Sequence, residues 1–310
     1  MKSDTTTPAE GAIAEVLELD EQVDLSDPGV RARVREALEV GNVLHLKGRG
    51  FKLTERERAI ITDPKILFRG NRERSKRNGR PTLTFDVATD RLLFNTIRTP
   101  ERREIEAMLR RYSNWSRDLL QKLVPEFALA CEQNRIIYRP VERSVTQGLH
   151  VDTTYLYPTQ GRSKLRIFCN IDPEGRPRGW EIGERFERLA QRYLPKVRIE
   201  RPWYEAAIDR SASLVGIVKG KHTAYDHVLE NIRILMKGDR DYQKSAPRRI
   251  VNFPPGSAWV ALTDIVLHGG LSGQHALDQV FFLPPEVMHN PSRSALRILE
   301  RLSGRTLSSG

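Results

Sequence analysis

The strand-like segments of this sequence are concentrated after residue 130, and this arrangement limits the folds open to the chain. Each segment is a short apolar run bounded by Pro, Gly or Asp, which is typical of β-strands. Their spacing is irregular, and helical patterns interrupt them near residues 183–195 and 222–237, so a jelly-roll sandwich or barrel is favoured over a regular βαβ alternation. The predicted strands are Arg135–Val141, Lys164–Ile171, Ser213–Val218, Ile250–Phe253, Ala258–Leu262 and Leu277–Leu283.

Apolar residues recur at helical spacing in four other segments. The longest, Ile105–Leu123, carries one apolar stripe and predicts an amphipathic helix that faces the core. Residues 186–194 and 225–236 repeat the pattern, and a last helix is predicted over Ser294–Leu302, before Gly304. The predicted fold class is therefore α+β, with a double-stranded β-helix (jelly-roll) core and flanking N-terminal, inserted and C-terminal helices.

The domain organisation follows from composition. Residues 1–26 are acidic, rich in Thr and without aromatic residues, so we expect a mobile tail or a loosely held helix. Residues 27–310 are expected to form a single jelly-roll domain. Within it, residues 27–130 give mainly helical support, 131–285 supply the barrel strands with helical insertions, and 286–310 hold the C-terminal helix.

The charge of the chain is unevenly distributed. The formal net charge is +11, but residues 1–30 hold eight acids against Lys2 alone, which leaves +18 on the other 280 residues. A body this basic is expected to attract a phosphate-bearing partner, such as nucleic acid, an anionic membrane surface or a charged lipid. The densest basic run is Lys65–Arg80. Its charge is compatible both with a solvated loop and with a loop that contacts a ligand.

Two absences point to a cytoplasmic protein. No stretch approaches the roughly 18 apolar residues that span a bilayer, and the N-terminus has no basic region followed by an apolar run. The chain holds two cysteines, Cys131 and Cys169, and both are predicted to be buried free thiols.

The most informative motif is His150-Val151-Asp152, directly upstream of a predicted strand. Residues i and i+2 of an extended segment project to the same side, so His150 and Asp152 can aim at one point. His268, near the end of the strand-like run 259–267, is the preferred third ligand. Two imidazoles and one carboxylate are the donor set of non-haem Fe(II) oxygenases. His275 and His289 are rival third ligands, but both are predicted to be surface residues, as are His45, His222 and His227.

A 2-oxo acid cosubstrate needs a cation for its distal carboxylate, and bidentate pairing favours Arg. The strand 164–171 alternates, with Lys164 and Arg166 on one side and Leu165 and Ile167 on the other. Arg166 is therefore the preferred cation, provided that this side lines the inside of a barrel; a solvent-facing edge strand is the alternative. Arg297, in the predicted C-terminal helix, is the second candidate.

The sequence as a whole resembles the Kdo hydroxylases, where Kdo is 3-deoxy-D-manno-oct-2-ulosonic acid. The resemblance covers most of the chain after about residue 40 and is far more specific than the His-x-Asp motif. It is carried by His150, 164–168, 170–173, 177–180, 183–186, 225–227, Tyr242, Gln243, 253–256, Trp259, Thr263, Asp264, His268, Gly273, Gln274, Gln279, Phe281, Met288, Pro291 and 296–302.

The resemblance implies an Fe(II)- and 2-oxoglutarate-dependent dioxygenase that uses O2. Its iron ligands would be His150, Asp152 and His268, and Arg166 would hold the cosubstrate. It would hydroxylate C3 of Kdo on a lipid A precursor, giving D-glycero-D-talo-oct-2-ulosonic acid (Ko) in the inner core of bacterial lipopolysaccharide. Such an enzyme would work at the cytoplasmic face of the inner membrane, in peripheral contact with an anionic surface. No nucleic-acid partner is then expected, and a homo-oligomer is left open.

Two other functions compatible with the residues are kept. One is a jelly-roll oxygenase that acts on a different anionic substrate, such as a nucleic-acid base, with the same iron site. The other is a non-catalytic jelly-roll that binds a sugar or phosphate without metal.

Overall fold

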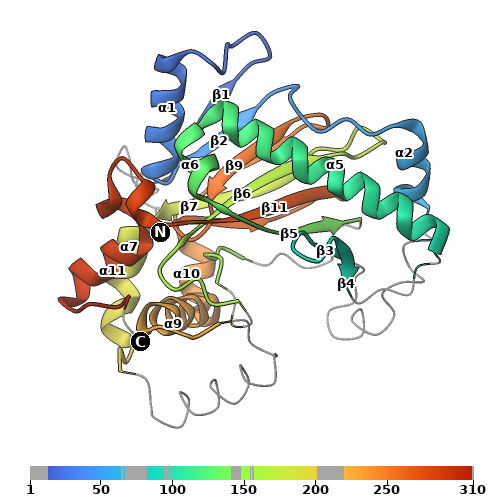
Figure 1. The fold of residues 1–310 in the computed structure, drawn as a ribbon. Coiled ribbons are helices and arrows are strands. Elements are labelled where there is room, and N and C mark those ends of the chain that lie inside the picture. Colours follow the sequence, from blue (N-terminus) through green and yellow to red (C-terminus); the bar gives the residue numbers. More distant parts are fainter. Residues whose placement is uncertain are drawn as a thin grey trace, which may run out of the picture.

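The computed structural model describes residues 13–63, 66, 82–93, 97, 99–140, 148–153, 155, 157–200 and 220–308. Two β-sheets form the centre of the molecule, with helices around them (Figure 1). The large sheet has the order β1 (Val16–Leu19), β2 (Val43–Leu46), β9 (Ala258–Leu262), β6 (Ser163–Asn170), β11 (Ala276–Leu283), β5 (Glu132–Arg139), β3 (Leu83–Asp86) and β4 (Arg91–Leu93). The small sheet has the order β10 (Val266–Gly270), β7 (Arg178–Arg185) and β8 (Arg249–Phe253).

An aromatic cluster fills the space between the two sheets. Trp259 of β9 stacks on Phe253 of β8 with ring centroids 4.3 Å apart, and on its neighbour Phe168 of β6 at 5.2 Å. Trp180 of β7 meets Trp259 edge-on at 5.5 Å. Because these large side chains come from both sheets, they hold the sheets face to face, as in a jelly-roll.

Helix α5 (Thr99–Leu123) crosses the outer face of the large sheet (Figure 1). Its apolar stripe packs on the outward-facing side chains of β6, Leu165, Ile167 and Cys169. Tyr112 Oη of α5 donates a hydrogen bond to the carbonyl of Ile167 at 2.9 Å. Helices α1 (Pro28–Glu39), α2 (Glu55–Thr62) and α6 (Pro125–Ala130) extend this layer. Both faces of β6 are therefore buried.

The remaining helices pack near the small sheet. Helix α9 begins after a capping box in which Thr223 and Asp226 bond each other's backbone, and α11 lies between the N-cap Ser294 and Gly304, whose φ of 66° suits glycine. The helices and short 3-10 turns of this second group are α7 (Phe186–Tyr193), η2 (Leu194–Lys196), α9 (Ala224–Gly238), α10 (Arg240–Ser245), η3 (Pro285–Val287), η4 (Pro291–Arg293) and α11 (Ala295–Ser303).

The structure confirms the predicted fold class and most of the predicted elements. The helices expected over 105–123, 186–194, 225–236 and 294–302 are α5, α7, α9 and α11. The strands expected near 135, 164, 250, 258 and 277 are β5, β6, β8, β9 and β11. The predicted strand Ser213–Val218 lies outside the described residues, as does nearly all of the basic run 65–80.

The expectation that strands begin only after residue 130 is wrong. Strands β1 to β4 precede that point, and β2 joins the large sheet beside β9. The acidic tail is also corrected in part, because β1 pairs in parallel with β2, and Ala14, two residues before β1, is buried. These strands have three or four residues each, too few for their periodicity to be distinct in the sequence.

Two further strands differ from expectation. The run 259–267 is not one strand, because residues 263–265 turn and separate β9 from β10. Strand β7 was not predicted, since it starts directly after a Pro- and Arg-rich turn. Both cysteines are free thiols as predicted; Cys169 is buried, whereas Cys131 is half-buried.

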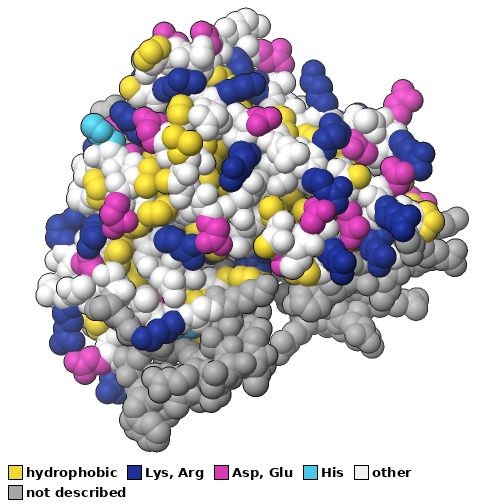
Figure 2. Space-filling model, viewed as in Figure 1, with side chains coloured by type: hydrophobic (Ala, Val, Ile, Leu, Met, Phe, Trp, Pro, Cys, Tyr) yellow, Lys and Arg dark blue, Asp and Glu magenta, His cyan; other side chains and the backbone are white. Residues whose placement is uncertain are grey.

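Charge on the face that α1 and α5 cover is mixed. Figure 2 shows Lys and Arg side chains interspersed with Asp and Glu across this face. No helix among the described residues is both long and apolar enough to cross a membrane.

Candidate metal centre

Backbone pairing brings the His-x-Asp segment next to β10. The His150 amide donates to the His268 carbonyl at 3.0 Å, and the His268 amide donates back at 2.9 Å, which adds a one-residue bridge to the edge of the small sheet. Two residues on, the Asp152 amide donates to the Thr263 carbonyl at 2.8 Å. The segment is therefore anchored on both sides of Val151.

Close packing around this segment requires glycine at two positions. Gly148 has a φ of 68°, and a Cβ there would lie 2.4 Å from Gln243 Oε1. A Cβ on Gly269 would lie 2.8 Å from the Gly148 carbonyl. Only glycine allows the backbone of residue 148 and strand β10 to approach this closely.

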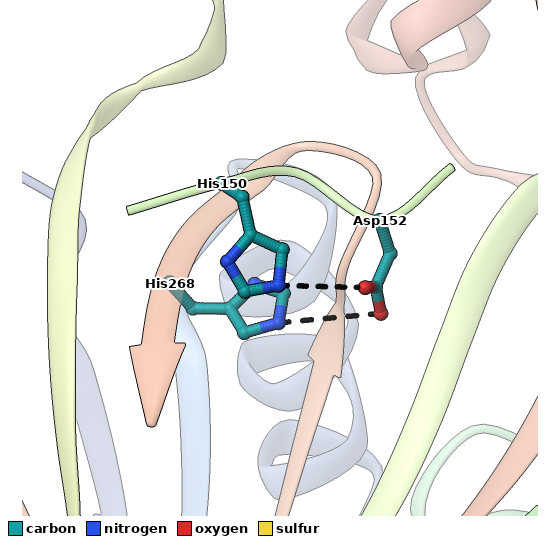
Figure 3. Close-up of side chains that lie close together, drawn as sticks. All are labelled: His150, Asp152 and His268. Atoms are coloured by element: carbon teal, nitrogen blue, oxygen red, sulfur yellow. Dashed lines mark ion pairs between the residues drawn. The ribbon is translucent and has the colours of Figure 1, made fainter. Parts of the chain in front are cut away.

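The three side chains converge as the motif predicted (Figure 3). His150 Nε2 lies 3.8 Å from Asp152 Oδ1, and His268 Nε2 lies 4.0 Å from Asp152 Oδ2. One ligand atom of each residue lies within 4.8 Å of the others. This is a spacing at which the three could hold one metal ion.

Hydrogen bonds fix both imidazoles for metal binding. Nδ1 of His150 donates to the Gly148 carbonyl at 3.0 Å, and Nδ1 of His268 donates to the Val266 carbonyl at 2.8 Å. Since a carbonyl can only accept, the proton is on Nδ1 and the Nε2 lone pair faces Asp152. Burial, followed by the neighbouring His268, lowers the pKa of His150 to about 3. Burial also lowers the pKa of His268.

Asp152 is held as a carboxylate. Burial by itself would raise the pKa of Asp152, but the adjacent Arg166 guanidinium, together with the Lys164 ammonium, holds this pKa well below its ordinary value. Two neutral imidazoles and one ionised carboxylate are the protonation states that a metal ligand set needs.

A strongly basic cavity of about 210 Å³ opens beside the three residues. Of its described lining residues, seven are cationic, and Asp152 supplies the one carboxylate. Trp180 and Trp259 supply apolar wall, and Trp180 stacks on the His268 ring at 4.9 Å. The cationic residues are Arg135, Arg139, Lys164, Arg166, Arg178, Arg233 and Lys237. An anionic ligand is the natural occupant of such a cavity.

Arg166 lies inside this cavity, as its place on the alternating strand predicted. Strand β6 is central, between β9 and β11, so the alternative of a solvent-facing edge is wrong. The guanidinium donates to Asp152 and to Asp278 of β11, and Arg139 of β5 also pairs with Asp278. Nε of Arg166 is buried and has no hydrogen-bond partner among the described residues. A donor in this state suits a ligand oxygen.

Arg297 does not line the cavity, and this corrects its prediction as the second candidate for the cation that binds the cosubstrate carboxylate. Its side chain is 42% exposed on α11 and pairs with Glu300 at 2.6 Å. Helical spacing placed it on the polar face of α11, and that face turns outward. Of the two rival third ligands, His289 is exposed as predicted, whereas His275 is buried. Of the other histidines predicted at the surface, His45 and His222 are buried and His227 is half-buried. His275 bonds Tyr138 at 2.6 Å, away from the metal centre.

Several site residues were not predicted. Arg135 and Arg139 lie two positions either side of Ile137 in β5, and this alternation was a usable signal. Asp278 is a single acid within an apolar strand, and an isolated acid of this kind was a second usable signal. Nothing local marks Gln243 of α10, although its side chain pairs with both backbone groups of Leu149.

The donor set fits iron and the cavity fits an anionic cosubstrate. Two histidines and one carboxylate beside an open basic cavity match non-haem iron sites that bind a 2-oxo acid, and the buried Nε of Arg166 offers that acid a donor. The fold and the site therefore define a 2-oxoglutarate-dependent, non-haem Fe(II) oxygenase. The sequence matches the family described as 3-deoxy-D-manno-oct-2-ulosonic acid (Kdo) hydroxylase over residues 22–306. The chain belongs to this family.

Solved structures agree with this assignment. The chain is similar to the Kdo hydroxylase KdoO in complex with succinate and Fe(III), with 30% identity over 95% of this chain and 98% of that one and a TM-score of 0.84. KdoO in complex with α-ketoglutarate and Fe(III) is 29% identical over 94% of this chain and 97% of that one, with a TM-score of 0.83. KdoO in complex with cobalt(II) is 30% identical over 95% of this chain and 98% of that one, also with a TM-score of 0.83. No curated protein sequence matches the chain.

Proposed function

We propose that this protein hydroxylates C3 of Kdo attached to a lipid A precursor and thereby forms Ko in the inner core of lipopolysaccharide. One observation carries the proposal: in a member of the Kdo hydroxylase family, His150, Asp152 and His268 converge beside a basic cavity. The family gives the sugar, and the cavity gives a site for an anionic ligand.

His150, Asp152 and His268 are the proposed protein ligands of Fe(II). Iron held there supplies O2 activation coupled to oxidative decarboxylation of 2-oxoglutarate, which yields succinate, CO2 and a hydroxylated substrate. The chain itself keeps the imidazoles neutral and aimed through the carbonyls of Gly148 and Val266. The apolar walls of the cavity, Trp180 and Trp259, help to position the carbon that is oxidised.

Arg166 is the proposed partner of the distal carboxylate of 2-oxoglutarate. Its support is threefold: it lines the cavity, its position is fixed by Asp152 and Asp278, and its Nε has no partner among the described residues. A fixed guanidinium loses little entropy when it binds a carboxylate. Lys164 lines the same cavity, and burial lowers its pKa to about 8, so part of its positive charge is lost near neutral pH.

The lipid substrate leads to a proposal for location. A protein that acts on a lipid-anchored anion must meet it at the membrane surface, and a net charge of +11 supports attraction to an anionic leaflet. We place the protein at the cytoplasmic face of the inner membrane, bound peripherally. Flotation with vesicles containing an anionic lipid, at low and at high salt, tests this; the same recovery in neutral vesicles contradicts it.

The test of function is a mass measurement. The protein is incubated with Fe(II), 2-oxoglutarate, O2 and the Kdo-bearing lipid A precursor, and the sugar is expected to gain one oxygen. Asp152→Ala abolishes the gain, and His289→Ala, a change of an exposed histidine, preserves it. If 2-oxoglutarate is consumed but the sugar gains no oxygen, the substrate assignment is wrong, and an anionic alternative such as a nucleic-acid base is tested next. If anaerobic Fe(II) and 2-oxoglutarate give no visible charge-transfer band, the metal assignment is wrong.

A further inference from the structure

Four of the seven cations of the cavity form two pairs, one on the large sheet and one on α9. Arg139 and Arg166, on the large sheet, are tied to the buried carboxylate of Asp278. Arg233 and Lys237 come instead from α9, which lies below the large sheet in Figure 1. The Arg233 side chain is 29% exposed and Lys237 is exposed, whereas the Arg166 side chain is only 8% exposed, so the pair on α9 is the more accessible to solvent.

Arg233 has a fixed position relative to the metal centre. Its Nη1 donates to Glu230 Oε1 at 2.8 Å, and Glu230 also accepts a hydrogen bond from Thr153, the residue after Asp152. One carboxylate thus connects α9 to the segment that carries a metal ligand. A guanidinium has five N–H donors, so the bond to Glu230 leaves donors for a second anion. Lys237 lies one turn further along the same face of α9.

The chemistry of the sugar acid determines where its carboxylate must bind. In a 3-deoxy-2-ulosonic acid the carboxyl carbon is C1 and the deoxy carbon is C3, so a single carbon separates them. If C3 faces the metal, the carboxylate must lie inside the metal cavity. Phosphates on the lipid are many bonds away and fall outside this limit. The residues that bind the sugar carboxylate must therefore line the cavity.

We propose that Arg233 and Lys237 bind the carboxylate of the sugar acid and thereby set the specificity for an acidic sugar. This inference rests on the proposed function, which supplies the sugar. Arg233 gives a planar pair of donors and Lys237 a second positive charge one turn away, an arrangement that suits a carboxylate. Glu230 is a positioning residue, since it holds Arg233 and Thr153 and does not itself bind the sugar acid.

The test measures binding without turnover. The Co(II)-loaded protein with 2-oxoglutarate is titrated with the methyl glycoside of Kdo and, separately, with the methyl ester of that glycoside, and the Co(II) absorption is followed. The wild type is expected to bind the acid at least about 10-fold more tightly than the ester, because the ester lacks the charge. Arg233→Ala and Lys237→Ala each lower the affinity for the acid about 10-fold and leave that for the ester unchanged. Arg240→Ala, at an exposed position of α10, behaves as the wild type.

Each contrary result has one meaning. If both variants keep the preference for acid over ester, the assignment of Arg233 and Lys237 is wrong while the proposed function stands. If 2-oxoglutarate changes the wild-type spectrum but neither glycoside does, the sugar substrate is wrong and the proposed function fails with it. In a third arm, vesicles of a phosphorylated lipid A precursor without the sugar acid are expected to bind all variants equally. Weaker vesicle binding by Arg233→Ala would assign this residue to phosphate and overturn the proposal.

Discussion

Asp278 on β11 accepts a hydrogen bond from Arg166 on the adjacent strand β6, and Arg139 on β5, the strand on its other side, pairs with the same carboxylate. Asp278 is fully buried. One acid thus holds two guanidinium groups from the neighbouring strands at the wall of the cavity. The pairing fixes Arg166 beside Asp152 before any ligand arrives.

Neutralising Asp278 is expected to destabilise the fold. Asp278→Asn keeps the shape but leaves two buried cations side by side, and breaking a buried ion pair costs roughly 3–5 kcal/mol. Urea unfolding of the metal-free protein should show a loss of about this size. Glu126→Gln is the matched control, because its pair with Arg35 is exposed and should contribute less than about 1 kcal/mol. Equal losses of stability in the two variants would show that the buried ion pairs of Asp278 contribute no more to folding than the exposed pair does.

Replacing Arg166 is expected to weaken binding of 2-oxoglutarate. Loss of a buried charge-assisted pair costs on the order of 2–5 kcal/mol, so Arg166→Ala should raise the apparent requirement for 2-oxoglutarate by at least about 30-fold. Arg297→Ala removes an exposed arginine and should leave the requirement unchanged. The measurement is 2-oxoglutarate consumption at varied cosubstrate concentration. An unchanged requirement in Arg166→Ala would transfer the role to Lys164.

Local patterns predicted those parts of the site that depend on a single element. Alternation in residues 164–171 placed Arg166 on the interior face of β6 because a strand has a period of two. The same geometry predicted that His150 and Asp152 aim at one point. The long stripe of α5 was equally clear, because 25 residues give many turns to average.

Features that depend on how elements pack were not predictable. Arg297 and Arg233 both lie on the polar side of an amphipathic helix, and the sequence gives no reason to separate them. The structure turns Arg297 outward on α11 and Arg233 toward the cavity from α9. Strand β1 was missed because its four residues are held by pairing with β2 across 27 positions of sequence. Long-range pairing of this kind leaves no local periodicity.

Gln243 is expected to support metal binding from outside the ligand set. Its Oε1 accepts from the Leu149 amide at 3.0 Å and its Nε2 donates to the Leu149 carbonyl at 3.0 Å, so it holds the residue before His150. Gln243→Ala removes both bonds, and changes to such supporting residues weaken metal affinity about 10- to 100-fold. Co(II) titration followed by absorption measures this. Lys244→Ala, at the exposed neighbouring position, should bind Co(II) as the wild type does; equal affinity of the Gln243 variant would contradict the supporting role.

Asp264 is expected to make stability depend on pH. It lies buried between β9 and β10, where Oδ1 accepts from the Lys164 amide at 3.1 Å and Oδ2 has no hydrogen-bond partner among the described residues. Burial raises its pKa from 3.8 to about 6. The folded state thus favours the protonated acid, so this stabilising contribution is complete below about pH 4 and is lost as the pH rises through 6.

Asp264→Asn replaces the ionisable group and keeps the Oδ1 acceptor. The difference in unfolding free energy between the variant and the wild type is therefore expected to grow in favour of the variant between pH 4 and pH 7, by roughly 3 kcal/mol at most, since one pKa unit corresponds to about 1.4 kcal/mol. Urea unfolding with a metal chelator, at several pH values, gives this difference, and the contributions of other titrating groups cancel in it. A difference that stays constant with pH would show that Asp264 titrates alike in the folded and unfolded chain.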